Sequence, residues 1–274
     1  MTSETSATDA SDSPASTFPP IRTVPIAAPF SWLAAGFRDV RKAPAASLAY
    51  GAVFAAMGGL IAFVFRHAYE VLTALVAGFL LLGPFLATGL YDISRRLERG
   101  EPVSLAATAV AWRSNLGAFS LFALVLTIVM LVWARASLVT FALFFSSGMP
   151  TLKSFVGQVV SLEHADFLVT YLAVGAVFAT IVFAISVVSV PMMLDRGTDT
   201  IVAALNSVRA LFANPLPLAL WALIIVALVA AGFATFFVGL IVVVPVIGHA
   251  TWHAYRALLV YATAPPSHVH SERN

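Results

Sequence analysis

Long apolar stretches alternate along the chain with short gaps that hold most of its charged residues. Six of these stretches approach or exceed the roughly 20 residues that a helix needs to cross a hydrocarbon core about 30 Å thick. The pattern therefore predicts an all-α, polytopic membrane protein with six transmembrane helices arranged as three hairpins. The predicted spans are residues 47–65, 71–91, 116–133, 167–190, 216–233 and 237–255.

The last two predicted spans lie in one run without a charged residue between Arg209 and Arg256. This run is too long for a single crossing helix. Gly232 and Gly239 bracket the expected break, because glycine relaxes backbone restrictions at tight turns. We therefore expect a turn at residues 234–238.

Composition supports lipid as the main solvent. With 60% hydrophobic and 10% charged residues, 274 residues have too little polar surface to cover a water-soluble globule. The chain has no cysteine, which excludes disulfides, thiolate metal sites and cysteine nucleophiles. Its net charge is only +2 and its basic residues flank apolar stretches, so we expect no nucleic-acid partner.

Basic residues fall on alternate sides of the predicted spans. With both chain ends in the cytoplasm, Arg66, Arg135 and Lys153 lie outside and all other basic residues lie inside, which is the positive-inside bias of membrane proteins. The predicted inside set is Arg22, Arg38, Arg41, Lys42, Arg95, Arg96, Arg99, Arg113, Arg196, Arg209, Arg256 and Arg273. The polar composition of both chain ends predicts disordered tails at 1–20 and 263–274, on either side of one membrane domain, residues 21–262.

Residues 138–162 form the longest gap on the predicted outer side. Residues 138–145 are apolar but short, and glycine, proline and Lys153 interrupt the pattern before helical spacing resumes at 152–162. We expect one or two short helices on the outer face. A re-entrant segment and a seventh span are the alternatives, and the latter would bury Lys153 and move Arg256 outside, against the charge bias.

Three amphipathic stripes occupy the predicted inner gaps, at residues 30–40, 105–116 and 201–212. Each pattern predicts a short interfacial helix with its apolar face in the headgroup boundary. Arg38 and Arg41, Arg113 and Arg209 would lie on the wet side. Expected boundaries are Pro29 and Pro102 at helix starts, Thr198 as an N-cap, and Gly100 and Asn214–Pro215 as stops.

An interfacial helix followed by a hairpin thus occurs three times, and each hairpin has a proline in its returning helix: Pro84, Pro191 and Pro245. One interpretation is a three-fold pseudo-symmetric bundle with a central site, as in repeat-built transporters. The other is the ordinary alternation of a polytopic protein whose prolines cause structural kinks. The pattern favours neither.

Candidate functional side chains lie at inner helix ends. Asp92, Asp195 and His249 would form a ring of polar groups at an inner mouth, but solvated helix ends beside Arg95 and Arg196 are the favoured alternative. His249 and His253 are four residues apart, and we interpret them as interfacial polar residues rather than metal ligands. No catalytic, metal-binding or cofactor motif occurs, so we expect a protein that is not an enzyme.

Three segments resemble a bacterial family of predicted integral membrane proteins of unknown function, some of whose members carry a provisional label of cytochrome c oxidase subunits. They are IRTVPIAAPFSWLAAGFRDVRKAP, GPFLATGLYDISRRLERGEP and VSVPMMLDRGTDTIVAALNSVRALFANP. The resemblance runs from Ile21 to about Leu259 and implies an inner (plasma) membrane location. It brings no catalytic residue. A haem–copper site needs imidazoles from several helices, but only His249 lies well inside a predicted span, with His253 one turn nearer the inner surface of the same helix, so a catalytic oxidase subunit is excluded.

We therefore expect a scaffold, accessory or assembly component whose partners are the lipid bilayer and other membrane proteins or a second copy. The alternative is a small permease or channel with a central cavity. A polar cavity lined by residues such as Thr73, Thr127, Ser186 or Thr235 would favour the permease, and a dry, closely packed centre would favour the scaffold.

Overall fold

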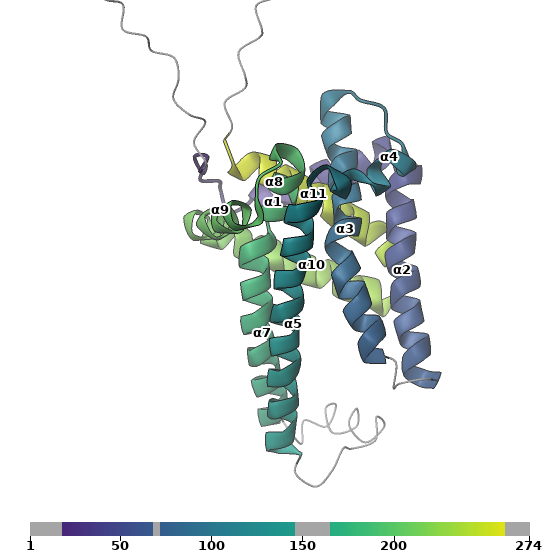
Figure 1. Cartoon of the computed structure of the whole chain (residues 1–274), viewed down its shortest axis with the longest axis vertical. Coiled ribbons are helices and arrows are strands. Elements are labelled where there is room, and N and C mark those ends of the chain that lie inside the picture. Colours follow the sequence, from purple (N-terminus) through teal and green to yellow (C-terminus); the bar gives the residue numbers. More distant parts are fainter. Residues whose placement is uncertain (1–17, 68–71, 146–164, 261–274) are drawn as a thin grey trace, which may run out of the picture.

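The computed structural model describes residues 18–67, 72–145 and 165–260, with no side-chain detail for residues 65, 66 and 72–81. Over these ranges the chain is helical, and its only extended pairing is an isolated bridge between Ile21 and Leu259 (Figure 1). The all-α class is therefore confirmed. Of the predicted tails, residues 18–20 are described, and the carbonyl of Pro20 accepts a hydrogen bond from the Val260 N–H.

The helices follow one another in the order that Figure 1 labels. They are α1 (Ala28–Lys42), α2 (Pro44–His67), α3 (Leu72–Arg99), α4 (Leu105–Ala109), the 3-10 helix η2 (Ala111–Asn115), α5 (Leu116–Phe144), α7 (Ala165–Ser186), α8 (Ser189–Arg196), α9 (Thr200–Ala213), α10 (Pro215–Ala234) and α11 (Leu240–Leu258).

Four helical stretches in the described ranges are long and apolar enough to cross a membrane. They are Pro44–Val64, Ala111–Phe144, Ala165–Arg196 and Pro215–Ala234. The chain is thus a helical protein with several membrane-crossing candidates. Crossing by α3 and α11 stays a prediction.

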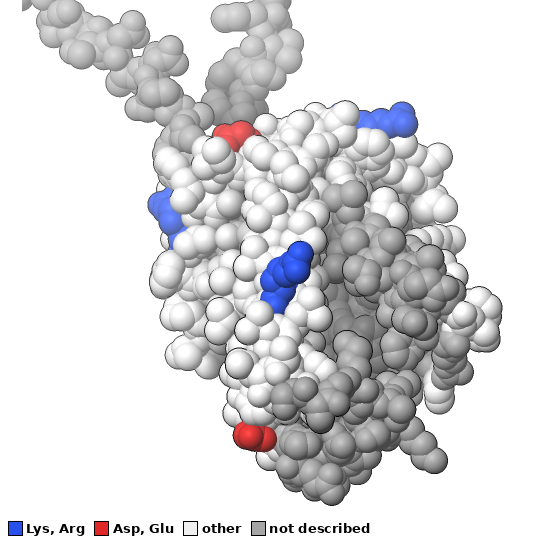
Figure 2. All heavy atoms as spheres, turned by 60° about the horizontal axis from the view of Figure 1, so that its bottom comes forward, with Lys and Arg blue, Asp and Glu red and all other residues white. Residues whose placement is uncertain are grey.

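The short helices gather at one end of the molecule. Figure 1 places α1, α4, α8 and α9 there, together with the paired strands of chain near Ile21 and Leu259, and we call this the polar end. The basic residues of the predicted interfacial set belong to α1 and α9, to the adjoining end of α3 and, for Arg113, to η2, which follows α4. With the opposite end turned forward, the visible described surface carries only scattered charged side chains (Figure 2).

Helix boundaries at the polar end follow local chemistry. Proline occupies the first turn of α1 and of α10, where a missing N–H costs no hydrogen bond. Asp199 caps α9 by accepting hydrogen bonds from the N–H groups of Ile201 and Val202, so the predicted cap at Thr198 is wrong by one residue. Asn214 separates α9 from α10, as predicted.

Three predicted elements need correction. Residues 138–144 continue α5 without a break, because no helix breaker follows Trp133 before Phe144; residues 152–162 lie outside the described ranges. The fourth predicted span ends early, since α7 stops at Ser186 and Pro191 falls in the first turn of α8. The stripe at 105–116 is divided between α4 and η2.

The correction at Pro191 also removes the proposed equivalence of three prolines. Pro84 and Pro245 lie inside α3 and α11, whereas Pro191 begins a short helix at the polar end. Proline in a first turn removes no intrahelical hydrogen bond, but proline inside a helix does. The three positions therefore differ in their physical role.

The packed core lies toward the polar end. Here α11 packs between α1 and α2 and also contacts α3. The fully buried side chains include Trp221, Trp252, Tyr255, Phe119 and Phe122. By contrast, α5 and α7 pack mainly on each other, and most buried residues of α5 lie in its first two turns. The α5–α7 pair is therefore anchored at one end.

Candidate functional site

A chain of five hydrogen-bonded side chains joins four helices at the polar end. We call it the histidine relay: Asp39 on α1, Ser47 on α2, Ser94 on α3, and His249 and His253 on α11. Ser47 and His249 are fully buried, and Ser94 and Asp39 are 1% and 6% exposed. Burial of so many polar groups is tolerated because each has a partner.

The hydrogen-bond pattern fixes the direction of each proton in the relay. The single hydroxyl hydrogen of Ser94 is donated to Asp39 Oδ2 at 2.8 Å, so Ser94 Oγ accepts from His249 Nδ1–H at 2.8 Å. A neutral His249 then leaves Nε2 as an acceptor for the Ser47 hydroxyl at 2.9 Å. All donors thus point toward the Asp39 carboxylate, which also receives His253 Nε2 at 2.8 Å.

The carboxylate of Asp39 is stabilised in its charged form. Burial raises the pKa of Asp39, but hydrogen bonds from His253 and Ser94 and the neighbouring imidazoles outweigh burial and lower the pKa below its ordinary value of 3.8. Asp39 therefore stays ionised at neutral pH and holds the relay together.

A serine hydrogen-bonded to a histidine is also the arrangement of a catalytic nucleophile and its base. Ser47 differs from a nucleophile in its access, because its side chain is fully buried and lines none of the cavities described below. Its hydroxyl is enclosed by the described helices. The relay therefore ties α1, α2, α3 and α11 together.

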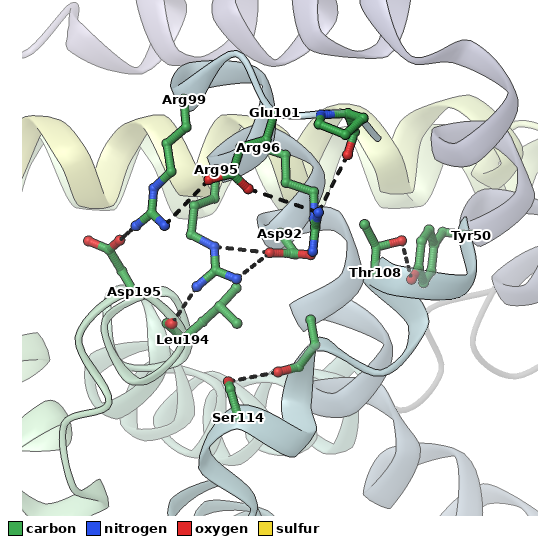
Figure 3. A network of polar contacts seen from close by, with 12 residues as sticks. Tyr50, Asp92, Arg95, Arg96, Arg99, Glu101, Thr108, Ser114, Leu194 and Asp195 are labelled. Carbon is green, nitrogen blue, oxygen red and sulfur yellow. Dashed lines mark hydrogen bonds and ion pairs between the residues drawn. The ribbon is translucent and has the colours of Figure 1, made fainter. Parts of the chain in front are cut away.

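A second polar network surrounds Asp92 at the end of α3 (Figure 3). The Asp92 side chain is fully buried and binds both Arg95, through Nε at 2.9 Å and Nη2, and Arg96, through Nε at 2.7 Å. Arg95 also donates to the carbonyl of Leu194 on α8 at 2.8 Å. This bond links the end of α3 to α8.

Asp195 forms the other centre of this arginine network. Its side chain is 5% exposed and contacts Arg99 of α3 at 3.1 Å and Arg256 of α11 at 3.7 Å. The hydroxyl of Tyr255 donates to Asp195 Oδ2 at 2.8 Å. Glu101 lies between Arg96 and Arg99 at 3.9 and 4.0 Å, and so connects the two centres. The network joins α3, α8 and α11.

The structure places the predicted polar residues differently from either interpretation of the sequence. The prediction that Asp92 and Asp195 are solvated at helix ends is wrong, because both carboxylates are buried and paired with arginines. A single ring is wrong as well, because His249 belongs to the relay around Asp39 rather than to the arginine network. The physical reason is that the two carboxylates are packed among α3, α8 and α11, so they are buried although Arg99 at the end of α3 stays 49% exposed.

Sequence reasoning missed Asp39, Ser47 and Ser94. A signal for Asp39 was present, since it lies seven residues after Trp32 and therefore on the same apolar face of α1. A carboxylate in such a stripe needs a buried partner. The two serines gave no comparable signal.

A lateral cleft lies between α3 and the α5–α7 pair. Two adjoining cavities form it, of about 450 Å³ and about 250 Å³, which share Phe183 and Ser186 as lining residues. The larger is lined by α5 and α7, including Val129, Trp133, Gly175 and Ala179, and the smaller by several helices, including Gly83, Pro84, Ala87, Tyr91, Trp221 and Ile247.

Small residues four positions apart stand on both walls of this cleft. Gly83 and Ala87 are on α3, and Gly175 and Ala179 are on α7. A Cβ added at Gly83 would meet no atom within 4 Å, and one at Gly175 would meet only Trp133 Nε1 at 4.0 Å. Both glycines therefore face unfilled space.

Comparison with known proteins adds one finding. Residues 71–195 match the model of a family described as predicted integral membrane protein (DUF2189). The resemblance inferred from the sequence is confirmed over this segment, which carries Asp92, the arginines of α3 and Asp195; the cytochrome c oxidase label is not shown. Neither a curated protein nor a solved structure matches the chain.

The described residues contain no group of three or more His, Cys, Asp or Glu side chains arranged to hold a metal ion. His249 and His253 both use ring nitrogens for hydrogen bonds within the relay. The two polar networks connect neighbouring helices at the polar end.

Proposed function

We propose that this protein is a non-enzymatic accessory or scaffold component of the bacterial inner membrane, and that it holds a transmembrane helix of a partner protein in the lateral cleft. The polar end would face the cytoplasm, because it carries the arginines of α1, α3, η2 and α9. The walls of the cleft carry this proposal.

Helices associate in membranes through close packing rather than through the hydrophobic effect, and small residues at four-residue spacing allow backbones to approach. The pairs Gly83–Ala87 and Gly175–Ala179 offer such surfaces on opposite sides of the cleft, without a helix of the described chain against them. Where helices of this chain pack closely, its own residues fill such a position. At Gly51 a Cβ would lie 2.0 Å from the Ile241 carbonyl oxygen.

The rigid polar end supports the same proposal. The histidine relay and the arginine network fix α1, α2, α3, α8 and α11 relative to one another. Buried networks with satisfied hydrogen bonds provide rigidity, so the α3 wall of the cleft is held in place at the polar end.

Transport of a polar solute has less support. The hydroxyls of Thr127, Ser186 and Thr235 each donate to a carbonyl of their own helix, so they offer no donor to a solute in this arrangement. The side chain of Thr73 lies outside the described residues. The cleft is lined mainly by apolar side chains, which suits a helix better than a hydrated substrate.

Site-specific cross-linking in native membranes tests the proposal. A photoreactive residue replacing Ala179 is expected to form an adduct with another membrane protein, and the same residue at Gly59 is the control. Gly59 faces open space on α2, away from the cleft. Gly175→Leu would fill the cleft and abolish the adduct, whereas Gly59→Leu would leave it unchanged.

Mass spectrometry of the adduct identifies the occupant. A distinct membrane protein supports the accessory role. An adduct with lipid alone, or a dimer of this chain, contradicts it, because the cleft would then be filled without a partner protein.

A further inference from the structure

The depth of the α10–α11 hairpin follows from its contacts with α1. One side of α1 carries exposed Arg38, Arg41 and Lys42, and its apolar residues Phe30 and Phe37 are also exposed. The guanidinium of Arg41 lies 5.3 Å from the centroid of the Phe37 ring. A helix with this composition lies at the headgroup boundary, so α1 marks that level in the molecule.

Where α11 crosses α1, the two backbones nearly touch. A Cβ at Gly36 would lie 2.6 Å from the Val246 carbonyl oxygen and 2.7 Å from the Ala250 nitrogen. From Val246 back to Phe237 is nine residues and from Ala250 thirteen, or about 13–20 Å at the helical rise of about 1.5 Å per residue. The tip of the hairpin therefore lies at most about two thirds of a 30 Å core below the contact with α1.

Contacts with α2 give an independent measure of the same depth. Gly51 lies against Ile241, and Gly58 lies against the ring of Phe237. Beyond Gly58, α2 continues for nine residues to His67, which is again about 13 Å of helix. The α10–α11 turn thus ends well short of the lower end of α2 (Figure 1).

Length and composition alone would let α10 cross the membrane. Its packing shows a strong tilt instead. Leu228, more than halfway along α10, shares the wall of a cavity of about 400 Å³ with Phe30 and Phe37 of α1. After thirteen residues α10 is still close to the interfacial helix, where a perpendicular helix would have descended about 20 Å.

The tip itself is apolar, and its turn supplies acceptors for most of its own N–H groups. Phe236, Val238 and Phe233 are 86%, 65% and 54% exposed. The N–H groups of residues 236, 238, 239 and 240 all have acceptors within the turn, and the Thr235 hydroxyl accepts from Gly239 N–H while it donates to the Gly232 carbonyl. Internal satisfaction of this kind is what hydrocarbon demands of a backbone.

Phe236 and Phe237 adopt φ values of 52° and 69°, in the left-handed region. Non-glycine residues there carry a strain of about 1 kcal/mol or more. A turn in water would use Gly or Asn at these positions without that strain. Large apolar side chains are instead kept at the tip.

We infer that α10 and α11 form a re-entrant hairpin, which enters and leaves the membrane at the polar end and buries its Phe236 tip among the acyl chains near the bilayer midplane. This reduces the crossing helices among the described elements to α2, α3, α5 and α7. The inference is independent of what fills the lateral cleft.

The cysteine-free chain allows a direct test. Phe236→Cys is labelled with a fluorophore in detergent and reconstituted into phosphatidylcholine vesicles that carry a nitroxide either on the headgroup or near the acyl terminus. We expect the acyl nitroxide to quench Phe236→Cys several-fold more strongly than the headgroup nitroxide. His67→Cys, at the far end of α2, and Ser114→Cys, at the polar end, should show the opposite preference.

Accessibility in cell membranes provides the second readout. A membrane-impermeant maleimide should label His67→Cys and Ser114→Cys from opposite faces and should label Phe236→Cys from neither face until detergent is added. Labelling of Phe236→Cys from the His67 face, with preferential headgroup quenching, would show two complete crossings and overturn the inference. If Phe236→Cys does not fold, Val238→Cys at the same tip serves in both measurements.

Discussion

Replacing Asp92 with alanine should destabilise the polar end more than any other single change to its charged groups. Asp92 is the shared partner of Arg95 and Arg96, and its side chain is fully buried. The variant leaves two guanidinium groups, 17% and 23% exposed, without their carboxylate. Such a change differs from the loss of a surface ion pair, because the remaining charges stay largely desolvated.

The magnitude follows from what each arginine retains. Removing one partner of a buried pair costs about 3–5 kcal/mol. Arg95 keeps the Leu194 carbonyl, and Arg96 keeps a longer bond of 3.4 Å to the Pro102 carbonyl, so both remain partly satisfied. We therefore expect a loss near the lower limit, about 3 kcal/mol.

Thermal unfolding of the detergent-solubilised protein, followed by tryptophan fluorescence, measures this loss. At roughly 2 °C per kcal/mol for a chain of this size, Asp92→Ala should lower Tm by about 6 °C. Glu101→Ala is the matched control within the same network. Glu101 is 45% exposed and its ion pairs are long, at 3.9 and 4.0 Å, so its loss should cost well under about 1 kcal/mol.

A Tm of Asp92→Ala that is as close to the wild-type Tm as that of Glu101→Ala would refute the reasoning. That outcome would mean that water reaches the two guanidinium groups as readily as it reaches the surface, and that Asp92 is not enclosed as its contacts indicate. A reduced Tm in both variants would instead place the stabilisation in the whole network.

Two further predictions concern α1. Folding lowers the pKa of Asp39 below 3.8, so its ionised carboxylate contributes fully to stability above pH 3.8, and this contribution is lost as the pH falls toward the folded-state pKa. Acid titration of tryptophan fluorescence should show this transition in the wild type and not in Asp39→Asn. Gly36→Ala would place a Cβ 2.6 Å from the Val246 carbonyl and should lower Tm by several degrees, whereas Gly59→Ala, which meets no atom within 4 Å, should leave Tm unchanged or slightly raised. No change for Gly36→Ala would show that α1 can move away from α11.

Sequence patterns predicted the helices well where a local cause determines them. The α1 and α9 stripes, the stop at Asn214 and the turn after Ala234 all depend on residues close in the chain. The Asp92–Arg95–Arg96 spacing likewise places these side chains on one helix face. What the spacing could not give was burial, because the cover comes from α8, a hundred residues away.

Depth and long-range pairing were beyond the sequence for a physical reason. Hydrophobic length predicts whether a helix can cross, while tilt depends on packing against neighbours. The approach of Gly36 to α11 and of Gly58 to Phe237 sets that tilt, and neither contact has a signal in the order of residues. The partners of Asp39 on α3 and α11 lie 55 and 214 residues away in the chain, so the local pattern does not indicate them either.

The short α10–α11 hairpin and the open cleft have one structural origin. α11 reaches only partway down α2 and α3, and α5 and α7 are fixed mainly by their contacts with α3, α8, α9 and η2 near the polar end. Below that level nothing in the described chain holds the α5–α7 pair at a set distance from α3. The arginine network binds α3 to α8, the helix that follows α7, and so holds the polar-end side of the pair near α3. Asp92→Ala should then weaken cross-linking at Ala179 even where the protein remains folded, because the width of the cleft depends on a joint that this carboxylate stabilises.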